Sequence, residues 1–250
     1  MNIPEENPES PPSLATTPEA VRELDALLAS VSAAERLAWA AAQFGSRAAI
    51  GTSFQGAGIV ALHLAARRKL PLAAFTLDTG LLFPETLALK AELEARLEVC
   101  VESLRPDYSL TEQGKLFGDK LWERDPDLCC ELRKVQPLQD KLETLDCWIT
   151  GVRREQSETR TATGILELNK TPGGRWLWKL NPLADWTRER VWAHIHEHGL
   201  PYNKLHDQGY RSIGCLTCTR AIGEGGDERA GRWTGFGKKE CGIHTFLQRQ

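Results

Sequence analysis

Residues 48–80 read AAIGTSFQGAGIVALHLAARRKLPLAAFTLDTG, and this stretch decides the fold class. Residues 48–51 form a short apolar run, residues 59–68 have helical character, and residues 72–77 form a second apolar run. A strand, a helix and another strand of these lengths are typical of two parallel strands connected by a helix that packs across them.

The same alternation continues on both sides of this unit. Helices are expected from Pro18 onward, with Thr17 as the capping residue, and over residues 33–44, 84–97 and about 132–145. Extended segments are expected at residues 99–101 and 147–150. The sequence therefore predicts an α/β fold, a Rossmann-like parallel sheet with helices on both faces.

Ligands of such sheets bind at the carboxyl ends of the strands. Three predicted junctions between a strand and a loop lie at residues 51–54, 77–80 and 150–154. We expect these three junctions to face a single crevice.

Three regions are predicted along the chain. Residues 1–17 are acidic and rich in proline, so they are expected to form a disordered leader. Residues 18–220 hold the α/β domain. Residues 221–250 include seven glycines between Gly223 and Gly242 and are predicted to form a flexible tail.

Charge and composition exclude several classes of partner. The formal net charge is -3 and acidic and basic residues are mixed, which argues against nucleic acid or a membrane as the main partner but allows a small anion. The first residues lack the basic start and apolar run of a secretory signal, so we predict a cytoplasmic protein. Because thiols stay reduced there, the seven cysteines indicate metal binding or thiol chemistry.

Four of the cysteines are candidate metal ligands. Cys129 and Cys130 are adjacent, and Cys215 and Cys218 form a C-x-x-C motif. Adjacent cysteines on a helix diverge by roughly 100°, so they suit two corners of a [4Fe-4S] cluster better than one zinc ion. Zinc remains the alternative, and four unrelated buried cysteines are the third interpretation.

The other cysteines divide into one candidate nucleophile and two core residues. Cys241 follows Lys238 and Lys239 in the glycine-containing tail, where nearby cations favour a reactive thiolate. Cys100 and Cys147 lie in apolar, strand-like segments and are expected in the core.

Cationic side chains gather at the predicted site edges. Five arginines lie at the third junction and at the start of the tail, and guanidinium groups match the oxygens of phosphate and sulfate. They are Arg153, Arg154, Arg160, Arg229 and Arg232. Lys134 lies four residues after Cys130 and is either a cation beside the cluster or a solvated side chain. The loop after Ser53 is a weak candidate for binding phosphate at a helix start.

Three motifs give the chain a family resemblance. CCELRKVQPL at residues 129–138, IGCLTCTR at residues 213–220 and ECGIH at residues 240–244 resemble the assimilatory adenylyl-sulfate (APS) reductases. The resemblance covers about residues 51–244. In the first loop the sequence differs from the family, which typically has two acidic residues where Ala57 and Gly58 stand here.

The resemblance implies a fold like that of the adenine-nucleotide alpha hydrolases and an activity that reduces APS to sulfite and AMP, in sulfate assimilation for cysteine biosynthesis. It implies that Cys241 attacks the substrate sulfur and that thioredoxin or a glutaredoxin-like reductant releases sulfite. By position, Cys129, Cys130, Cys215 and Cys218 would bind a [4Fe-4S] cluster. The implied substrate-binding residues are Ser53, Phe54, Leu77, Thr79, Lys134, Gly151, Arg153, Arg160, Arg229, Arg232 and His244.

Other readings remain open. Reductases of the 3'-phosphorylated nucleotide (PAPS) generally lack both cysteine pairs, so the pairs favour APS, while use of both nucleotides stays an alternative. An ATP-dependent RNA-thiolating enzyme should show an S-G-G-x-D-S loop, which residues 53–58 do not match. A non-enzymatic iron-sulfur sensor would leave Cys241 and the arginines without a role. A homo-oligomer is also left open.

Overall fold

The computed structural model describes residues 14–222, 228–238, 240–244 and 246–248. Within these residues the strands form one six-stranded sheet in the order β3-β2-β1-β4-β6-β5. All neighbouring strands are parallel except β5 and β6. The strands are β1 (Ala48–Gly51), β2 (Ala73–Leu77), β3 (Val101–Leu104), β4 (Cys147–Ile149), β5 (Leu166–Lys170) and β6 (Trp176–Leu180).

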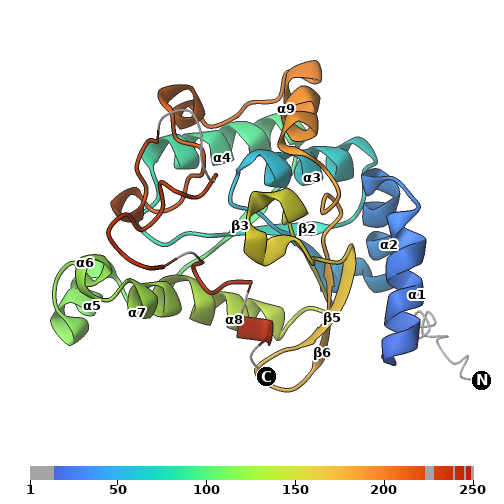
Figure 1. The fold of residues 1–250 in the computed structure, drawn as a ribbon, viewed down its shortest axis with the longest axis horizontal. Coiled ribbons are helices and arrows are strands. Elements are labelled where there is room, and N and C mark those ends of the chain that lie inside the picture. The colour runs from blue at the N-terminus through green and yellow to red at the C-terminus, as the bar shows by residue number, and fades with distance from the viewer. Residues whose placement is uncertain (1–13, 223–227, 239, 245, 249–250) are drawn as a thin grey trace, which may run out of the picture.

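Helices cover both faces of the sheet (Figure 1), which confirms the predicted α/β architecture. One face carries α1 (Pro18–Ala29), α2 (Ala33–Phe44), α3 (Gly56–Arg67), α4 (Pro84–Leu97) and α9 (Arg188–Glu197). Between α4 and α9 the chain forms α5 (Leu110–Phe117), α6 (Leu121–Arg124), α7 (Pro126–Cys130) and α8 (Gln136–Leu142). Of these, α8 packs on the other face of the sheet.

Alternating side chains of the strands feed two separate cores. Ile50 of β1 packs with the α2, α3 and α9 side, whereas its neighbour Ala49 packs with Leu138 and Leu142 of α8. Both faces are therefore apolar, because successive side chains of a strand point to opposite sides of the sheet.

Side-chain hydrogen bonds to the first backbone N–H groups fix the starts of α1 and α2. Thr17 accepts a hydrogen bond from Ala20 N at 3.3 Å, with Pro18 in the first helical turn. Ser32 and Glu35 form a reciprocal capping box at the start of α2. Of the predicted leader, residues 1–13 lie outside the described part of the chain.

Two expectations differ from the structure. The β5–β6 hairpin was not anticipated, and it adds an antiparallel strand at one edge of the parallel sheet. Cys100 is exposed rather than part of the core, because it lies in the turn between α4 and β3, one residue before the strand begins. Cys147 is fully buried in β4, as expected.

The long helix predicted at about residues 132–145 is interrupted. Residues Glu131–Val135 form a π-helical turn, and α8 follows from Gln136 to Leu142. Pro137 explains the interruption, because its ring clashes with the carbonyl group of Arg133 in a regular helix. Lys134 lies within this π-helical turn and is buried. None of the described helices combines the length and apolar character needed to cross a membrane.

Candidate active site

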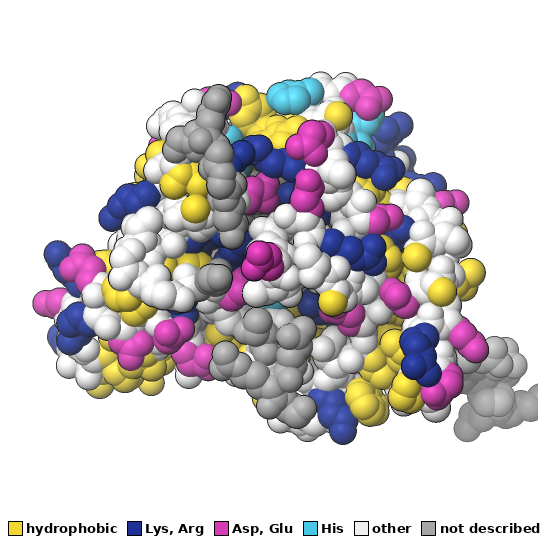
Figure 2. Space-filling model, in the orientation of Figure 1, with side chains coloured by type: hydrophobic (Ala, Val, Ile, Leu, Met, Phe, Trp, Pro, Cys, Tyr) yellow, Lys and Arg dark blue, Asp and Glu magenta, His cyan; other side chains and the backbone are white. Residues whose placement is uncertain are grey.

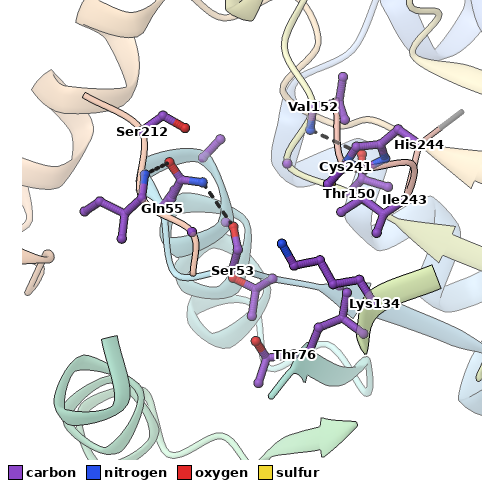
Figure 3. Close-up of a pocket in the computed structure, with 18 of the residues that line it drawn as sticks. Ser53, Gln55, Thr76, Lys134, Thr150, Val152, Ser212, Cys241, Ile243 and His244 are labelled. Atoms are coloured by element: carbon purple, nitrogen blue, oxygen red, sulfur yellow. Dashed lines mark hydrogen bonds between the residues drawn. The ribbon is translucent and has the colours of Figure 1, made fainter. Parts of the chain in front are cut away.

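The carboxyl ends of β1, β2 and β4 open onto one crevice. Its lining includes Ser53 after β1, Leu77 and Thr79 at the end of β2, and Thr150 and Gly151 after β4. The three junctions predicted from the sequence are therefore brought together. In Figure 3, Ser53, Gln55 and Thr76 lie on one side of the pocket, the tail residues lie on the other, and Lys134 points into the space between them.

Small residues let two of these loops approach closely. A Cβ atom at Gly151 would lie 3.1 Å from the backbone nitrogen of Gly58, so the loop after β4 touches the first turn of α3. A Cβ atom at Gly58 would overlap the Thr52 hydroxyl. At position 58 a side chain would therefore meet Thr52, so glycine suits this close approach.

Gln55 connects the first loop to the cysteine-containing segment. Its side-chain oxygen accepts a hydrogen bond from Ile213 N at 3.1 Å, and its nitrogen lies 3.4 Å from Ser53 Oγ. The first loop is thereby held to the chain just before Cys215.

Four cationic side chains line the crevice: Lys134, Arg160, Arg229 and Arg232. Glu240 of the tail pairs with two of them, since its Oε2 lies 3.0 Å from Arg160 Nη2 and 3.1 Å from Arg229 Nη2. The tail thus places its own carboxylate among arginines that were predicted to bind the substrate.

A glycine makes room for one of these cations. A Cβ atom at Gly214 would overlap the guanidinium group of Arg232. Arg232 is buried and packs against Trp233, with its Cζ atom 4.6 Å from the ring centroid. Its Nε atom has no hydrogen-bond partner among the described residues.

Cys241 lies in the crevice beside these cations. Burial would raise the pKa of its thiol, but Lys134, Arg229, a backbone hydrogen bond from Ile243 and Arg232 together outweigh burial, so the pKa is lowered from its ordinary value. The thiolate is the nucleophilic form. Lys238 pairs with Asp127, and Lys239 lies outside the described residues.

His244 holds the tail against the sheet. Its ring stacks on Trp148 of β4 with a centroid distance of 5.1 Å and an interplanar angle of 12°. Burial, with Arg160, Lys179 and Arg229 nearby, lowers the pKa of His244 well below its ordinary value, so the ring is neutral. Trp148 Nε1 and His244 Nδ1 have no hydrogen-bond partner within the described part of the chain.

The four candidate ligand cysteines come from two separate segments. Cys129 and Cys130 end α7, and Cys215 and Cys218 flank a short 3-10 turn. Burial, followed by the charges of Cys130, Cys215 and Cys218, raises the pKa of Cys129 to about 12. Thr79 Oγ1 lies 3.3 Å from Cys215 Sγ, which connects the set to the crevice.

Three predicted residues do not line the crevice with their side chains. Phe54 is 2% exposed and packs in the core on the α3 side. Arg153 is buried, and its Nη1 donates to Glu155 Oε2 at 3.1 Å while its Nη2 donates to Glu228 Oε2 at 3.3 Å. Arg154 donates to the carbonyl oxygen of Thr163. The two arginines therefore bind other groups of the protein, and the Phe54 ring packs in the core.

Several lining residues were not predicted. They include polar or aromatic residues outside the three predicted junctions: Gln55, Thr76, Trp148, Gln156, Ser212 and Glu228. Thr52 and Thr150, which lie in two of those junctions, do line the crevice as expected. Gln156 lies in the predicted arginine segment, and its Oε1 accepts a hydrogen bond from Arg160 Nη1 at 2.6 Å. For Ser212 and Glu228 no local sequence signal exists.

Comparisons with known proteins identify the family. Residues 47–221 match the family model described as phosphoadenosine phosphosulfate reductase domain. The adenosine 5'-phosphosulfate reductase of Salinibacter ruber is 47% identical over 210 residues, which cover 84% of this chain and 82% of the relative. The phosphoadenosine 5'-phosphosulfate reductase of Gloeobacter violaceus is 43% identical over 212 residues, which cover 84% of this chain and 87% of the relative.

Solved structures show the same fold. The phosphoadenylyl-sulfate (PAPS) reductase from Candida auris, in its phosphate complex, is 32% identical with a TM-score of 0.72, covering 82% of this chain and 98% of that one. An FMN adenylyltransferase from Candida glabrata, 12% identical with a TM-score of 0.51, covers 82% of this chain and 66% of its own and shares the fold alone. The crevice, the cysteine motifs and the matching residues lead to one conclusion: the chain belongs to the phosphoadenosine phosphosulfate reductase domain family.

Proposed function

We propose that this chain reduces adenylyl sulfate to sulfite and AMP, with Cys241 as the nucleophile. The observation that carries the proposal is the position of this thiol in the crevice, where Lys134, Arg229 and Arg232 lower its pKa. The names of the relatives support the reaction class.

The first step forms a bond between Cys241 Sγ and the sulfur of the sulfonyl group. The bond from that sulfur to the bridging oxygen breaks, and AMP leaves with the electron pair. Negative charge therefore grows on the phosphate oxygen. Lys134, Arg160 and Arg229 line the same crevice and would stabilise this charge more in the transition state than in the ground state.

The second step is proposed to use thioredoxin as reductant. A thioredoxin thiolate attacks Cys241 Sγ in the S-sulfocysteine adduct, and sulfite leaves with the electron pair of the broken S–S bond. The second thioredoxin thiol then resolves the mixed disulfide, which returns Cys241 as a thiol and leaves thioredoxin oxidised. Sulfur gains two electrons in total. For this step residues 221–250 would move as the flexible tail of the 18–220 domain, in a reducing compartment such as the cytoplasm.

The cysteine set is proposed to bind a [4Fe-4S] cluster. Cys129, Cys130, Cys215 and Cys218 supply four free thiols, which match the four corners of such a cluster, and Cys215 and Cys218 lie close enough to Cys129 to affect its pKa. When bound, the cluster would supply charge and structural support beside the crevice rather than substrate electrons. Lys134 lies near this set, and although burial disfavours its ammonium, Cys215, Cys130 and Cys241 raise its pKa above the ordinary value.

The same cysteines favour APS over PAPS as the substrate, since the resemblance implies that PAPS reductases generally lack both pairs. Purified protein supplied with thioredoxin and either nucleotide would test this choice. We expect the value of kcat/KM to be higher for APS, and a higher value for PAPS would reverse the assignment.

The reaction itself is tested by trapping the adduct. Anaerobically purified protein is incubated with APS labelled at sulfur, without a reductant, and label on the protein is counted. We expect close to one label per chain in the wild type and in Cys100→Ser, an exposed cysteine that serves as the matched control. Adding thioredoxin should release the label as sulfite.

Cys241→Ser decides the role of the nucleophile. Loss of the label in this variant, with the absorbance of the metal centre unchanged, supports the proposal. Full labelling of Cys241→Ser, or no label on the wild type, would reject it.

A further inference from the structure

Three histidines meet at the packed surface between α3 and α9, outside the crevice. They are His63 of α3, His194 of α9 and His198 at the carboxyl end of α9. One ring nitrogen from each lies within 4.8 Å of the others, and His63 Nδ1 is 2.9 Å from His194 Nε2. None of the three lines the crevice.

The spacing of these residues suits a metal ion. His194 and His198 are four residues apart and therefore lie on one face of the helix. Their ring centroids are 4.4 Å apart, and those of His63 and His198 are 4.8 Å apart. The rings are inclined by 69° and 41° rather than stacked face to face. Two histidines of one helix and one from its neighbour thus converge on a single point.

The distances are close to those of a zinc site. Zn–N bonds are about 2.0–2.1 Å long, so three imidazole nitrogens around zinc lie roughly 3.4 Å apart. To bind zinc, nitrogens at the full 4.8 Å spread would move about 1.4 Å closer, and His63 Nδ1 and His194 Nε2, now 2.9 Å apart, would separate by about 0.5 Å. His63 is buried, whereas His194 and His198 are partly exposed, so a fourth ligand can come from solvent.

Charged groups near the three histidines affect their affinity for a cation. Arg67 and Arg96 act on His63, while Arg67, Arg190 and Glu197 act on His194. The three arginines are exposed, so solvent and salt screen their repulsion toward a cation. Figure 2 shows histidine side chains reaching the surface at the end of the molecule that α9 forms.

We propose that His63, His194 and His198 bind one zinc ion, with a water molecule in the fourth position. The ion would join α9 to α3. The first turn of α3 lines the crevice. Gly56 in that turn packs against α9, because a Cβ atom at Gly56 would lie 2.9 Å from Val191 Cγ1. Zinc binding would therefore stabilise one wall of the crevice from behind.

The test measures metal binding and not turnover, so it is independent of the proposed reductase activity. Full-length protein, purified anaerobically with its iron content measured, is titrated at pH 7.5 with Zn²⁺ against a chromophoric chelator. We expect one zinc per chain and a higher unfolding temperature in the wild type and in His196→Gln. His196 lies on the same helix but is exposed and outside the cluster, which makes it the matched control.

His194→Gln should weaken zinc binding by at least about tenfold. Loss of a group that only orients a metal ligand already costs about tenfold in affinity, and loss of the ligand itself should cost more. His198→Asn, at a partly exposed helix end, should do the same and serves if His194→Gln does not fold. Co²⁺ added in place of zinc should give weak bands of nitrogen and oxygen ligands without thiolate charge transfer. Equal zinc affinity in the variants and the wild type, or thiolate bands with Co²⁺, would overturn the proposal.

Discussion

Two thiols of this protein, Cys129 and Cys241, have pKa values that are shifted in opposite directions. Burial and three neighbouring thiols raise the pKa of Cys129 to about 12. Burial acts on Cys241 as well, but Lys134, Arg229, a backbone hydrogen bond from Ile243 and Arg232 together lower its pKa. Burial acts on both thiols, so the cations and hydrogen bonds around each one decide the direction of its shift.

The two sites therefore have different requirements. Burial and its neighbours favour the neutral thiol of Cys129, and a bound cationic centre would favour the thiolate. The tail thiol is activated by the protein's own side chains. Variants that alter each group separately should therefore have separable effects.

The largest effect is expected from Cys218→Ser, which removes one proposed cluster ligand. Iron content should fall, and APS reduction should drop by about 10-fold to 100-fold or more. Iron per chain and sulfite release are the measurements. Cys100→Ser, at an exposed cysteine outside the proposed ligand set, is the control. A Cys218→Ser protein with its full iron content would remove Cys218 from the ligand set.

The second effect concerns Arg229→Gln, which removes one cation beside Cys241. The pKa of Cys241 should rise, so a smaller fraction is thiolate at pH 7 and alkylation should slow by about threefold to tenfold. The rate increases as pH rises through the pKa, so the whole pH profile should move to higher pH. The rate of iodoacetamide alkylation at Cys241 is followed by mass spectrometry as a function of pH.

Arg220→Gln is the control for that profile, because Arg220 is exposed and its Nη1 donates to backbone oxygens. Identical profiles for Arg229→Gln and the wild type would show that Arg229 does not activate the thiol.

A smaller effect is expected from Glu240→Gln. Its carboxylate occupies Arg160 and Arg229, and neutralising it leaves both arginines more available to an anion. Binding of AMP should tighten by about threefold, the range of a partly buried ion pair. Calorimetric titration with AMP gives the Kd, and exposed Glu158→Gln is the control. Weaker AMP binding would show that Glu240 supports the site instead of competing with the ligand.

The smallest effect is expected from Cys100→Ser, because this thiol is exposed. The free energy of unfolding should change by less than about 0.5 kcal/mol. Cys147→Ser should lower it by about 1–3 kcal/mol, since a hydroxyl replaces a thiol in a fully buried strand. Urea unfolding of the apo proteins compares the two, and equal losses would contradict the assigned burial.

Much of the fold was predictable from local sequence. Apolar periodicity located β1, α2 and α4, and the capping residue Thr17 marked the start of α1. The strand-to-loop junctions located three walls of the crevice. These signals are local, because each depends on which face of one element is buried or on hydrogen bonds within one turn.

The sequence by itself determined the α/β class, the thiol motifs and most cationic residues of the crevice. Only the tertiary structure decided that Glu240 pairs with Arg160, that His244 stacks on Trp148, that Phe54 turns into the core, and that three histidines from α3 and α9 converge. The physical reason is that these contacts join residues far apart in the chain. No periodicity or motif records them, because they arise only when separate elements pack against one another.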